Sequence, residues 1–430
     1  MESSQYNYFI QLDGNILVFN GFTKKYFVIR AKNADKFKEV INNPELFRSD
    51  SRYLPFLEKM SEAGFIVDSR NTQYEEIKNA YKDYQMEDKY ILLIMPTYSC
   101  NFSCWYCVQK HQDVFMSDST ADKIKKHIVR YITENNIKSL YISWFGGEPL
   151  LYFDRIRQIT AFAREFCQKQ KINFGVGITT NSSLINDDIV DEMRNLSFKG
   201  FQITVDGASP YHNMTKKSSS IFNSFDLTLN NIVKVVRNIP DADMTVRINY
   251  TEYNITKDFV IELDHYLSPV KDKITIMFRK VWQVKENSTM HDKVLDCIKE
   301  LLKRGYRIEC DYDNFQVQTC YVEKKNYLSI FPDGKVDTCS NINISDARGE
   351  IEEDGRISWK SPVLATHDNI FEKASECKDC TFLPLCMGPC PLQREKRKGV
   401  KVIRCYKQNL PDEFHQKILD YCNMLTELDY

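Results

Sequence analysis

The sequence lacks the features that mark several common classes of protein. Among 430 residues, Lys and Arg number 58 and Asp and Glu 59, so a net charge of −1 provides no global field for nucleic acid or an anionic membrane. No stretch has the apolar length of a transmembrane helix, and the first residues lack the basic and apolar regions of a signal peptide. No P-loop, Ser-His-Asp set or acid–base dyad is visible. We therefore expect a cytoplasmic protein that binds neither nucleic acid nor membranes.

Cysteine is the residue that the sequence has in excess. Fourteen cysteines without a secretion signal favour metal or cluster ligation over disulfides. Cys100, Cys104 and Cys107 have C-x3-C-x2-C spacing and follow the apolar run 91–95, which predicts a parallel strand buried on both faces. Pro96 ends that strand, and ligand sites in α/β folds lie at the carboxyl ends of strands. Three thiolates can hold three irons of a four-iron four-sulfur cluster and leave the fourth open, although a zinc site has the same ligand chemistry.

A second motif follows the next predicted strand. Gly146, Gly147, Glu148 and Pro149 come after the run SLYISWF. Paired glycines allow the backbone to approach a ligand closely, and a carboxylate can accept hydrogen bonds from an ammonium group. The two motifs, in this order on successive strands, resemble those of the radical S-adenosylmethionine (SAM) superfamily. The cluster loop of that family also has an aromatic residue before its third cysteine, here Tyr106.

The resemblance implies a chemistry and a set of site residues. In the family, a reduced cluster cleaves SAM to a 5′-deoxyadenosyl radical that takes hydrogen from the substrate. Cys100, Cys104 and Cys107 would be the catalytic cluster ligands. The residues implied in SAM binding are Tyr106, Gly146, Gly147, Glu148, Thr180, Thr204 and Arg247. Three of the surrounding segments are weaker matches, since Ser182 replaces a glycine, Thr204 a serine and Asn213 an aspartate; strand-end capping or surface ion pairs would also account for Thr180, Thr204 and Arg247.

The middle of the chain alternates predicted strands and helices. This alternation is typical of a parallel sheet with right-handed crossovers. The predicted strands are 90–95, 140–145, 173–180, 201–205, 244–250 and 274–278, and the predicted helices are 117–134, 154–169, 187–195, 222–236, 257–267 and 292–303. Six strand–helix units resemble the partial (β/α)6 barrel of the superfamily, whose open side could admit a peptide.

The N-terminal segment, residues 1–72, reads as a small module of its own. Strands are predicted at 6–10, 15–20 and 26–30, with a turn at Asp13–Gly14, and helices at 34–41 and 53–63. This pattern resembles the winged-helix-like leader-peptide recognition module of radical SAM enzymes that modify ribosomally synthesised peptides. The resemblance implies a precursor peptide bound by strand addition, whereas an accessory domain that only packs on the barrel has the same pattern.

The C-terminal third contains a second cysteine pattern. It resembles the SPASM domain, the auxiliary-cluster extension of these peptide-modifying enzymes, and implies two further 4Fe-4S clusters. Its cysteines are Cys320, Cys339, Cys377, Cys380, Cys386, Cys390 and Cys405. The resemblance assigns Cys377, Cys380, Cys386 and Cys405 to one cluster, and Cys320, Cys339 and Cys390 to the other. The fourth ligand of the latter could be Cys310, the substrate or none. The run YLSIFPDGKVDTC predicts a hairpin turning at Asp333–Gly334.

We therefore predict five segments and one function. The segments are the leader module (1–72), a linking helix (73–89), the barrel (90–305), the SPASM domain (306–410) and a terminal helix (411–430). The predicted protein is a radical SAM maturase that crosslinks a ribosomally synthesised precursor peptide, using three 4Fe-4S clusters, SAM and an external electron donor such as flavodoxin or ferredoxin. Formylglycine formation on a sulfatase and a non-catalytic peptide scaffold are the alternatives. Asp206, Asp311 and Asp313 are unranked candidates for a catalytic base.

Overall fold

The chain divides into two compact units, and each is described by itself. Unit 1 comprises Met1–Glu87, Asp311–Lys325 and Leu364–Tyr430, and unit 2 comprises Asp88–Cys310 and Asn326–Val363. The structure is a computed structural model that describes residues 1–285, 287–309, 319–360, 370–373, 375–388, 390–391 and 410–428. Four residues singled out from the sequence lie outside the described residues: Cys310, Asp311, Asp313 and Cys405.

Unit 2 is built on one large sheet, and its first strands are parallel. The strand order is β12-β11-β10-β9-β8-β7-β6-β13-β14-β15-β16, and all neighbours from β12 to β13 run parallel. Seven of these parallel strands are consecutive in the chain and adjacent in the sheet: β6 (Lys89–Ile94), β7 (Ser139–Trp144), β8 (Asn173–Thr180), β9 (Phe198–Val205), β10 (Asp243–Tyr250), β11 (Ile274–Lys280) and β12 (Arg307–Glu309). The predicted α/β class with a partial parallel barrel is confirmed.

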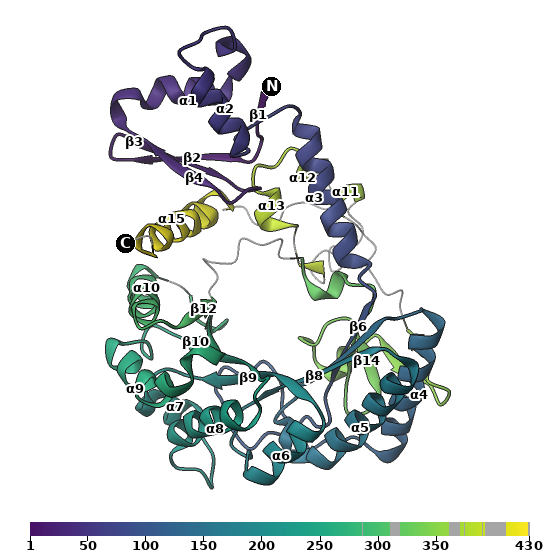
Figure 1. Ribbon diagram of the computed structural model, residues 1–430. Helices are drawn as coiled ribbons and strands as arrows, with labels where there is room; N and C mark the ends of the chain where they lie inside the picture. The colour runs from purple at the N-terminus through teal and green to yellow at the C-terminus, as the bar shows by residue number, and fades with distance from the viewer. Residues whose placement is uncertain are drawn as a thin grey trace. The chain divides into compact units, whose positions relative to one another are not determined.

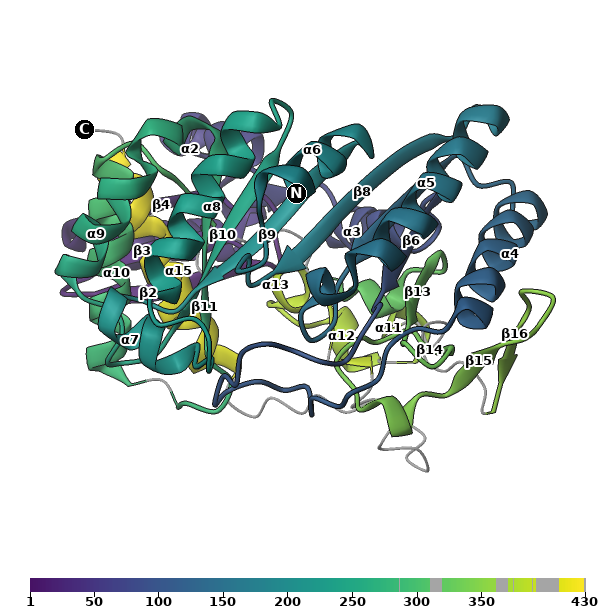
Figure 2. The same ribbon diagram turned by 90° about the horizontal axis from the view of Figure 1, so that it is seen from below.

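The crossover helices line the outer side of this curved sheet (Figures 1 and 2). They are α4 (Asp118–Glu134), α5 (Phe153–Gln170), α6 (Asp187–Asn195), α7 (Ser209–Thr215), α8 (Ser224–Asn238), α9 (Lys257–Leu267) and α10 (Ser288–Lys303). The short helix α7 was not predicted. Most of these helices begin where a side-chain oxygen accepts a hydrogen bond from the first turn, as Ser117, Asn186 and Thr256 do.

Burial alternates along the strands. In β6, Tyr90, Leu92 and Ile94 are buried, whereas Ile91 and Leu93 are half-buried. The prediction that this strand is buried on both faces was wrong in this respect, because Ile91 and Leu93 stay partly exposed. Leu93 nevertheless packs against a buried cluster that includes Met95 and Phe331.

The segment after residue 326 extends the same sheet. Strand β13 (Tyr327–Ile330) pairs parallel with β6 and antiparallel with β14 (Lys335–Asp337). Gly334 has a φ of 86°, which a glycine adopts without strain, so the predicted hairpin turn is confirmed. Two more antiparallel strands, β15 (Gly349–Ile351) and β16 (Ile357–Trp359), complete the sheet.

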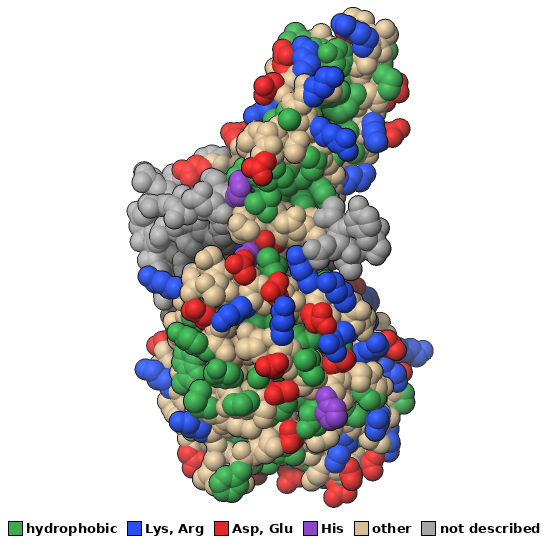
Figure 3. All heavy atoms as spheres, turned by 90° about the vertical axis from the view of Figure 1, so that its left-hand side faces the viewer, with side chains coloured by type: hydrophobic (Ala, Val, Ile, Leu, Met, Phe, Trp, Pro, Cys, Tyr) green, Lys and Arg blue, Asp and Glu red, His purple; other side chains and the backbone are tan. Residues whose placement is uncertain are grey.

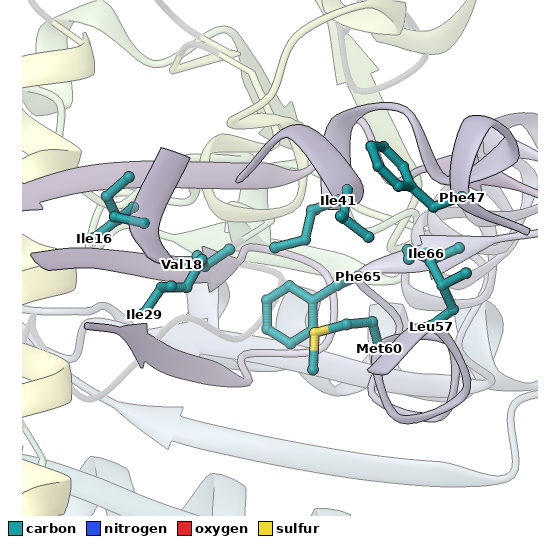
Figure 4. Close-up of a cluster of buried hydrophobic side chains, with 11 residues drawn as sticks. Ile16, Val18, Ile29, Ile41, Phe47, Leu57, Met60, Phe65 and Ile66 are labelled. Atoms are coloured by element: carbon teal, nitrogen blue, oxygen red, sulfur yellow. The ribbon is translucent and has the colours of Figure 1, made fainter. Parts of the chain in front are cut away.

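Unit 1 begins with a three-stranded antiparallel sheet of order β2-β3-β4. Strands β2 (Asn7–Leu12) and β3 (Asn15–Asn20) are joined at Asp13 and Gly14, whose φ values of 41° and 86° suit a two-residue hairpin turn. The remaining elements of the module are β1 (Glu2–Ser3), β4 (Tyr26–Ile29), α1 (Ala34–Asn42), α2 (Leu54–Glu62) and β5 (Ile66–Val67). Figure 4 shows the core that joins its sheet to its helices: Ile16, Val18, Ile29, Ile41, Phe47, Leu57, Met60, Phe65 and Ile66.

Two further helices of unit 1, α13 (Leu383–Cys386) and α15 (Leu410–Leu428), pack on the other face of this small sheet. Unit 1 also contains α3 (Arg70–Gln85), α11 (Ile370–Lys373) and α12 (Ser375–Lys378). Leu17 and Phe19 of β3 share a buried cluster with Leu385 of α13 and Phe414 of α15. None of the helices in the described ranges has the length and hydropathy needed to span a membrane.

Candidate functional site

The first three candidate cysteines lie on the loop between β6 and α4. The Phe102 backbone N–H donates to Cys100 Sγ at 3.5 Å, and Cys107 N donates to Cys104 O at 3.1 Å. Phe102 is buried and anchors the loop. These bonds fold the loop tightly around its cysteines.

Burial controls the acidity of these thiols. It raises the pKa of Cys100 to about 11 and of Cys104 to about 12, and also raises that of Cys107. The positive charge of Lys216 favours the thiolate form of all three cysteines. The negative charge of Cys107 opposes it, because it raises the pKa of Cys100 and of Cys104. Since thiolates are the ligands of iron–sulfur clusters, a buried cation beside them suits that donor set. Within the described ranges, no three His, Cys, Asp or Glu side chains are placed to bind a single metal ion. An iron–sulfur cluster needs a different arrangement, because each of its cysteine ligands binds a separate iron.

Gly146 and Gly147 are required by the close approach of two backbone segments. A Cβ atom on Gly146 would lie 2.5 Å from Thr97 O, and one on Gly147 would lie 2.1 Å from Ser99 O. Gly147 N donates to Thr97 O at 3.3 Å, and Glu148 N donates to Ser99 O at 2.8 Å. The two glycines therefore allow the segment after β7 to lie against the cysteine loop. Their contact with SAM stays a prediction.

Glu148 joins the ends of β7 and β8. Its buried carboxylate accepts hydrogen bonds from Thr180 Oγ1 (2.6 Å), Leu150 N (3.0 Å) and Asn181 N (2.7 Å). Burial raises the pKa of Glu148, while these bonds and the charge of Lys216 favour the ionised form. The structure thus brings Glu148 and Thr180 together through a direct hydrogen bond, and their contact with SAM stays a prediction.

Tyr106 belongs to a second polar group, at the ends of β9 and β10. Its hydroxyl donates to Asp206 Oδ1 at 2.7 Å and accepts from Asn249 Nδ2 at 2.9 Å. Asn249 Nδ2 also donates to Asp206 Oδ1 at 3.1 Å. Asp206 is buried, and its other oxygen, Oδ2, has no hydrogen-bond partner among the described residues. A buried acceptor of this kind is suited to a donor on a ligand.

Lys216 is a member of this group that the sequence did not reveal. Its Nζ donates to Thr204 Oγ1 at 2.6 Å and lies 3.7 Å from Asp206 Oδ2. Burial alone would lower the pKa of Lys216, but the negative charges of Asp206, Cys104, Cys100 and Glu148 outweigh it, so the pKa is raised. In the sequence, nothing distinguishes Lys216 from Lys217, which is exposed.

Thr204 and Arg247 stand opposite each other on β9 and β10. Arg247 Nε donates to Asn249 Oδ1 at 2.9 Å, which links it to the Tyr106 group. Tyr106, Thr204 and Arg247, predicted from three separate segments, are therefore brought into one polar network. Glu148 and Thr180 form a neighbouring group, which interacts with this network through the charge of Lys216.

A pocket of about 190 Å³ adjoins the network. Its lining combines aromatic and polar side chains: Trp105, Tyr106, Asp206, Tyr211, Met214, Thr215, Asn249, Thr251, Tyr253, Asn254 and Val281. Apolar walls with a few convergent polar groups are typical of sites for small organic ligands.

His212 supports Asp206 from within the fold. Its Nδ1 accepts a hydrogen bond from Asp206 N at 3.2 Å, and burial lowers the pKa of His212 to about 3. The ring is therefore neutral at physiological pH and carries its proton on Nε2. Asn213 Oδ1 accepts a hydrogen bond from Phe225 N, in the first turn of α8, at 2.9 Å, while Asn223 is the N-cap of that helix.

The cysteines assigned to the auxiliary clusters are divided between the units. Cys377, Cys380, Cys386, Cys390 and Cys320 belong to unit 1, and Cys339 belongs to unit 2. Cys377 and Cys380 pack against the buried side chains of Tyr6, Tyr74 and Leu383. Cys167, Cys297 and Cys422 are buried in helices. The ligand assignments of the auxiliary cysteines stay predictions.

Comparison with known protein families identifies the central stretch. Residues 94–257 match the model of the radical SAM superfamily, so this part of the chain is a radical SAM domain. The radical SAM cyclopropyl synthase TigE of Paramaledivibacter caminithermalis is 23% identical over 415 residues, covering 84% of this chain and 81% of that protein. A GTP 3′,8-cyclase of Campylobacter jejuni is 23% identical over 243 residues, covering 56% of this chain and 68% of that enzyme.

Solved structures share the fold. SuiB of Streptococcus suis, bound to its precursor peptide SuiA, aligns with a TM-score of 0.53 and 16% identity over 95% of this chain and all of that one (100%). The enzyme anSMEcpe, with bound AdoMet, aligns with a TM-score of 0.57 and 17% identity over 77% of this chain and 96% of that one. At these identities the likeness concerns the fold.

Proposed function

We propose that this protein is a radical SAM maturase that abstracts hydrogen from a ribosomally synthesised precursor peptide and forms a thioether or carbon–carbon crosslink. The observation that carries the proposal is the placement of Cys100, Cys104 and Cys107 beside a buried lysine and an aromatic pocket, within a radical SAM domain. A structural zinc site has no need of the adjoining pocket, and a non-catalytic peptide scaffold has no need of the three cysteines.

The cysteine loop and the polar network have distinct roles in this proposal. Cys100, Cys104 and Cys107 would hold a 4Fe-4S cluster, which when bound and reduced supplies the electron that cleaves SAM to a 5′-deoxyadenosyl radical. Lys216 offsets the negative charge of the thiolates. Gly147 keeps the segment that carries Glu148 against the cysteine loop.

The pocket beside the network would receive SAM. Trp105 and Tyr106 present aromatic surfaces to a nucleoside base. The Oδ2 of Asp206, which is ion-paired with Lys216 but has no hydrogen-bond partner among the described residues, can accept a hydrogen bond from a hydroxyl or ammonium group. Arg247, on the same network, can pair with a carboxylate. Because Asp206 is held by Tyr106 and Asn249, we assign it to ligand binding in preference to proton abstraction.

The N-terminal module would bind the precursor peptide. It has its own hydrophobic core and a small sheet in which β4 is a terminal strand. A terminal strand can accept an extended peptide by main-chain pairing. A peptide substrate is supported by SuiB, which shares the fold and has been solved with its precursor peptide.

The auxiliary cysteines and the redox partner complete the proposal. Cys377, Cys380, Cys386 and Cys405 would bind one auxiliary 4Fe-4S cluster, and Cys320, Cys339 and Cys390 the other. A flavodoxin or ferredoxin would supply electrons in the cytoplasm.

Two measurements on the anaerobically reconstituted protein test the function. With a strong reductant and SAM, the protein should release 5′-deoxyadenosine, and a Cys100→Ala variant should not. The mass of a short peptide encoded beside the gene should fall by two hydrogens per crosslink when it is co-produced with the enzyme. An unchanged peptide mass, with deuterium taken up from heavy water, would indicate epimerisation. Formation of formylglycine on a sulfatase would identify the protein as a sulfatase-maturating enzyme instead. Failure to cleave SAM would contradict the proposal and favour the non-catalytic peptide scaffold.

A further inference from the structure

A second pocket, of about 360 Å³, lies in the N-terminal module between β4 and α2. Tyr26 and Phe27 of β4 form one side of it, and Lys59, Met60 and Ala63, at the end of α2, form the other. The remaining lining residues are Lys24, Lys25 and Phe65. The pocket therefore adjoins the terminal strand of the sheet, where a peptide strand could be added.

The base of this pocket is apolar and well packed. Met60 and Phe65 are buried in the core of the module, and Phe65 contacts Phe27 edge to face with ring centroids 4.8 Å apart. Because these side chains are held by the core, the pocket is formed before a ligand arrives. It can bury an aliphatic or aromatic side chain from a peptide.

The rim of the pocket is positively charged. Lys24, Lys25 and Lys59 line it, and none of its described lining residues is acidic. On the face seen in Figure 3, Lys and Arg side chains lie over this module together with hydrophobic and acidic ones, so the positive charge belongs to the pocket rim and not to the whole face. A peptide that enters the pocket therefore gains from carboxylates placed near the three lysines.

Lys24 gives this rim a particular character. Its side chain is half-buried, and its Nζ donates to Gly21 O at 2.6 Å. Burial lowers the pKa of Lys24 to about 7. A carboxylate brought close to this amine would favour its charged form, so binding of an anion is coupled to protonation of Lys24.

We infer that the groove between β4 and α2 selects an acidic, extended peptide segment that inserts one hydrophobic side chain between Phe27 and Met60. This inference rests on the proposed function, in which the module receives the precursor peptide, and adds the chemistry of the segment that is recognised. Nucleic acid would match the charge, but the terminal strand and the apolar base favour a peptide.

Fluorescence anisotropy with the full-length protein tests the inference. The probes are three fluorescein-labelled nonapeptides that share leucine at alternate positions and carry glutamate, glutamine or lysine between them. The glutamate peptide should bind most tightly, and its affinity should fall with added salt. Lys25→Gln and Lys59→Gln should each weaken it about two- to five-fold, as for exposed ion pairs.

Lys32→Gln is the matched control, since Lys32 is an exposed lysine of the same module outside the pocket. It should leave the affinity for the glutamate peptide unchanged. Equal affinities for the three peptides, equal losses in all three variants, or no binding by any peptide would overturn the inference. A single-stranded oligonucleotide that outcompetes the glutamate peptide would do the same. SAM cleavage is measured separately, so loss of that activity contradicts the proposed function without bearing on the charge selectivity of the groove.

Discussion

Lys216 Nζ lies 3.7 Å from Asp206 Oδ2, and both side chains are buried, with 3% and 1% of their surfaces exposed. A buried ion pair is costly to form, and breaking it by removing one partner costs more still. This pair lies beside the cysteine loop and the pocket that we assign to SAM. Its place in the core therefore has a functional explanation: Lys216 balances the charges of Asp206, Glu148 and the thiolates of Cys100 and Cys104.

Replacing Lys216 by methionine should leave Asp206 as an uncompensated buried charge. We expect Lys216→Met to destabilise unit 2 by about 3–5 kcal/mol, measured by urea unfolding, and to reduce the iron retained after reconstitution. Lys217→Met removes an exposed lysine at the next position and should change neither quantity measurably. Equal stability and iron content for the two variants would contradict the role given to Lys216.

The contrast between these two lysines shows what the sequence could and could not predict. Tyr106, Thr204 and Arg247 were identified because they stand at fixed positions relative to motifs on strands. Lys216 lies at the end of α7, a helix of seven residues that was not predicted, and its direction into the core depends on the turn that follows Asp206–Gly207. Local periodicity does not report the direction of a side chain at a helix end.

Gly147→Ala tests the contact between the two sequence motifs. The new Cβ atom would meet Ser99 O at 2.1 Å, and a backbone atom cannot rotate away. We expect the variant to lose the iron bound by the cysteine loop, seen as a lower iron content and a lower visible charge-transfer absorbance after anaerobic reconstitution.

Gly21→Ala is the matched control for that substitution. A Cβ atom there would lie 3.5 Å from Leu385 Cγ, which is ordinary van der Waals contact. It should leave the absorbance unchanged. If Gly147→Ala keeps the same absorbance as Gly21→Ala, iron binding by the cysteine loop does not depend on the close contact between Gly147 and Ser99 O.

Cys377→Ala should distinguish cluster ligands from structural cysteines. Loss of one auxiliary cluster would lower the iron content by about four atoms per chain. Cys167→Ala is the control, because Cys167 is buried in α5 and is assigned no ligand role. Iron and sulfide analysis of the purified proteins provides the measurement. The same iron content in both variants would remove Cys377 from the ligand set.

The sheet extension illustrates another limit of prediction from sequence. The hairpin at Asp333–Gly334 followed from its turn residues, and it was confirmed. Its parallel pairing with β6 was not foreseen, because a four-residue strand such as Tyr327–Ile330 contains no signal for a partner more than two hundred residues earlier in the chain. Only the folded chain shows that β13 lies beside β6, the strand from which the cysteine loop continues.

The affinity of the groove for an acidic peptide should depend on pH through Lys24. In the free protein burial holds its pKa at about 7, and a bound carboxylate would raise that pKa, so binding above pH 7 takes up a proton. The affinity for the glutamate nonapeptide should therefore fall as the pH rises from 6 to 9, by at most about tenfold per unit for one proton. Glutamate itself remains ionised throughout this range.

Two variants test whether Lys24 is the group that titrates. Lys24→Met should weaken binding at pH 6 and remove most of the pH dependence, whereas Lys59→Met should weaken binding and keep the pH dependence. The comparison separates the two lysines because both line the groove, while only Lys24 is half-buried. A pH profile that is the same in both variants would show that Lys24 does not face the bound peptide.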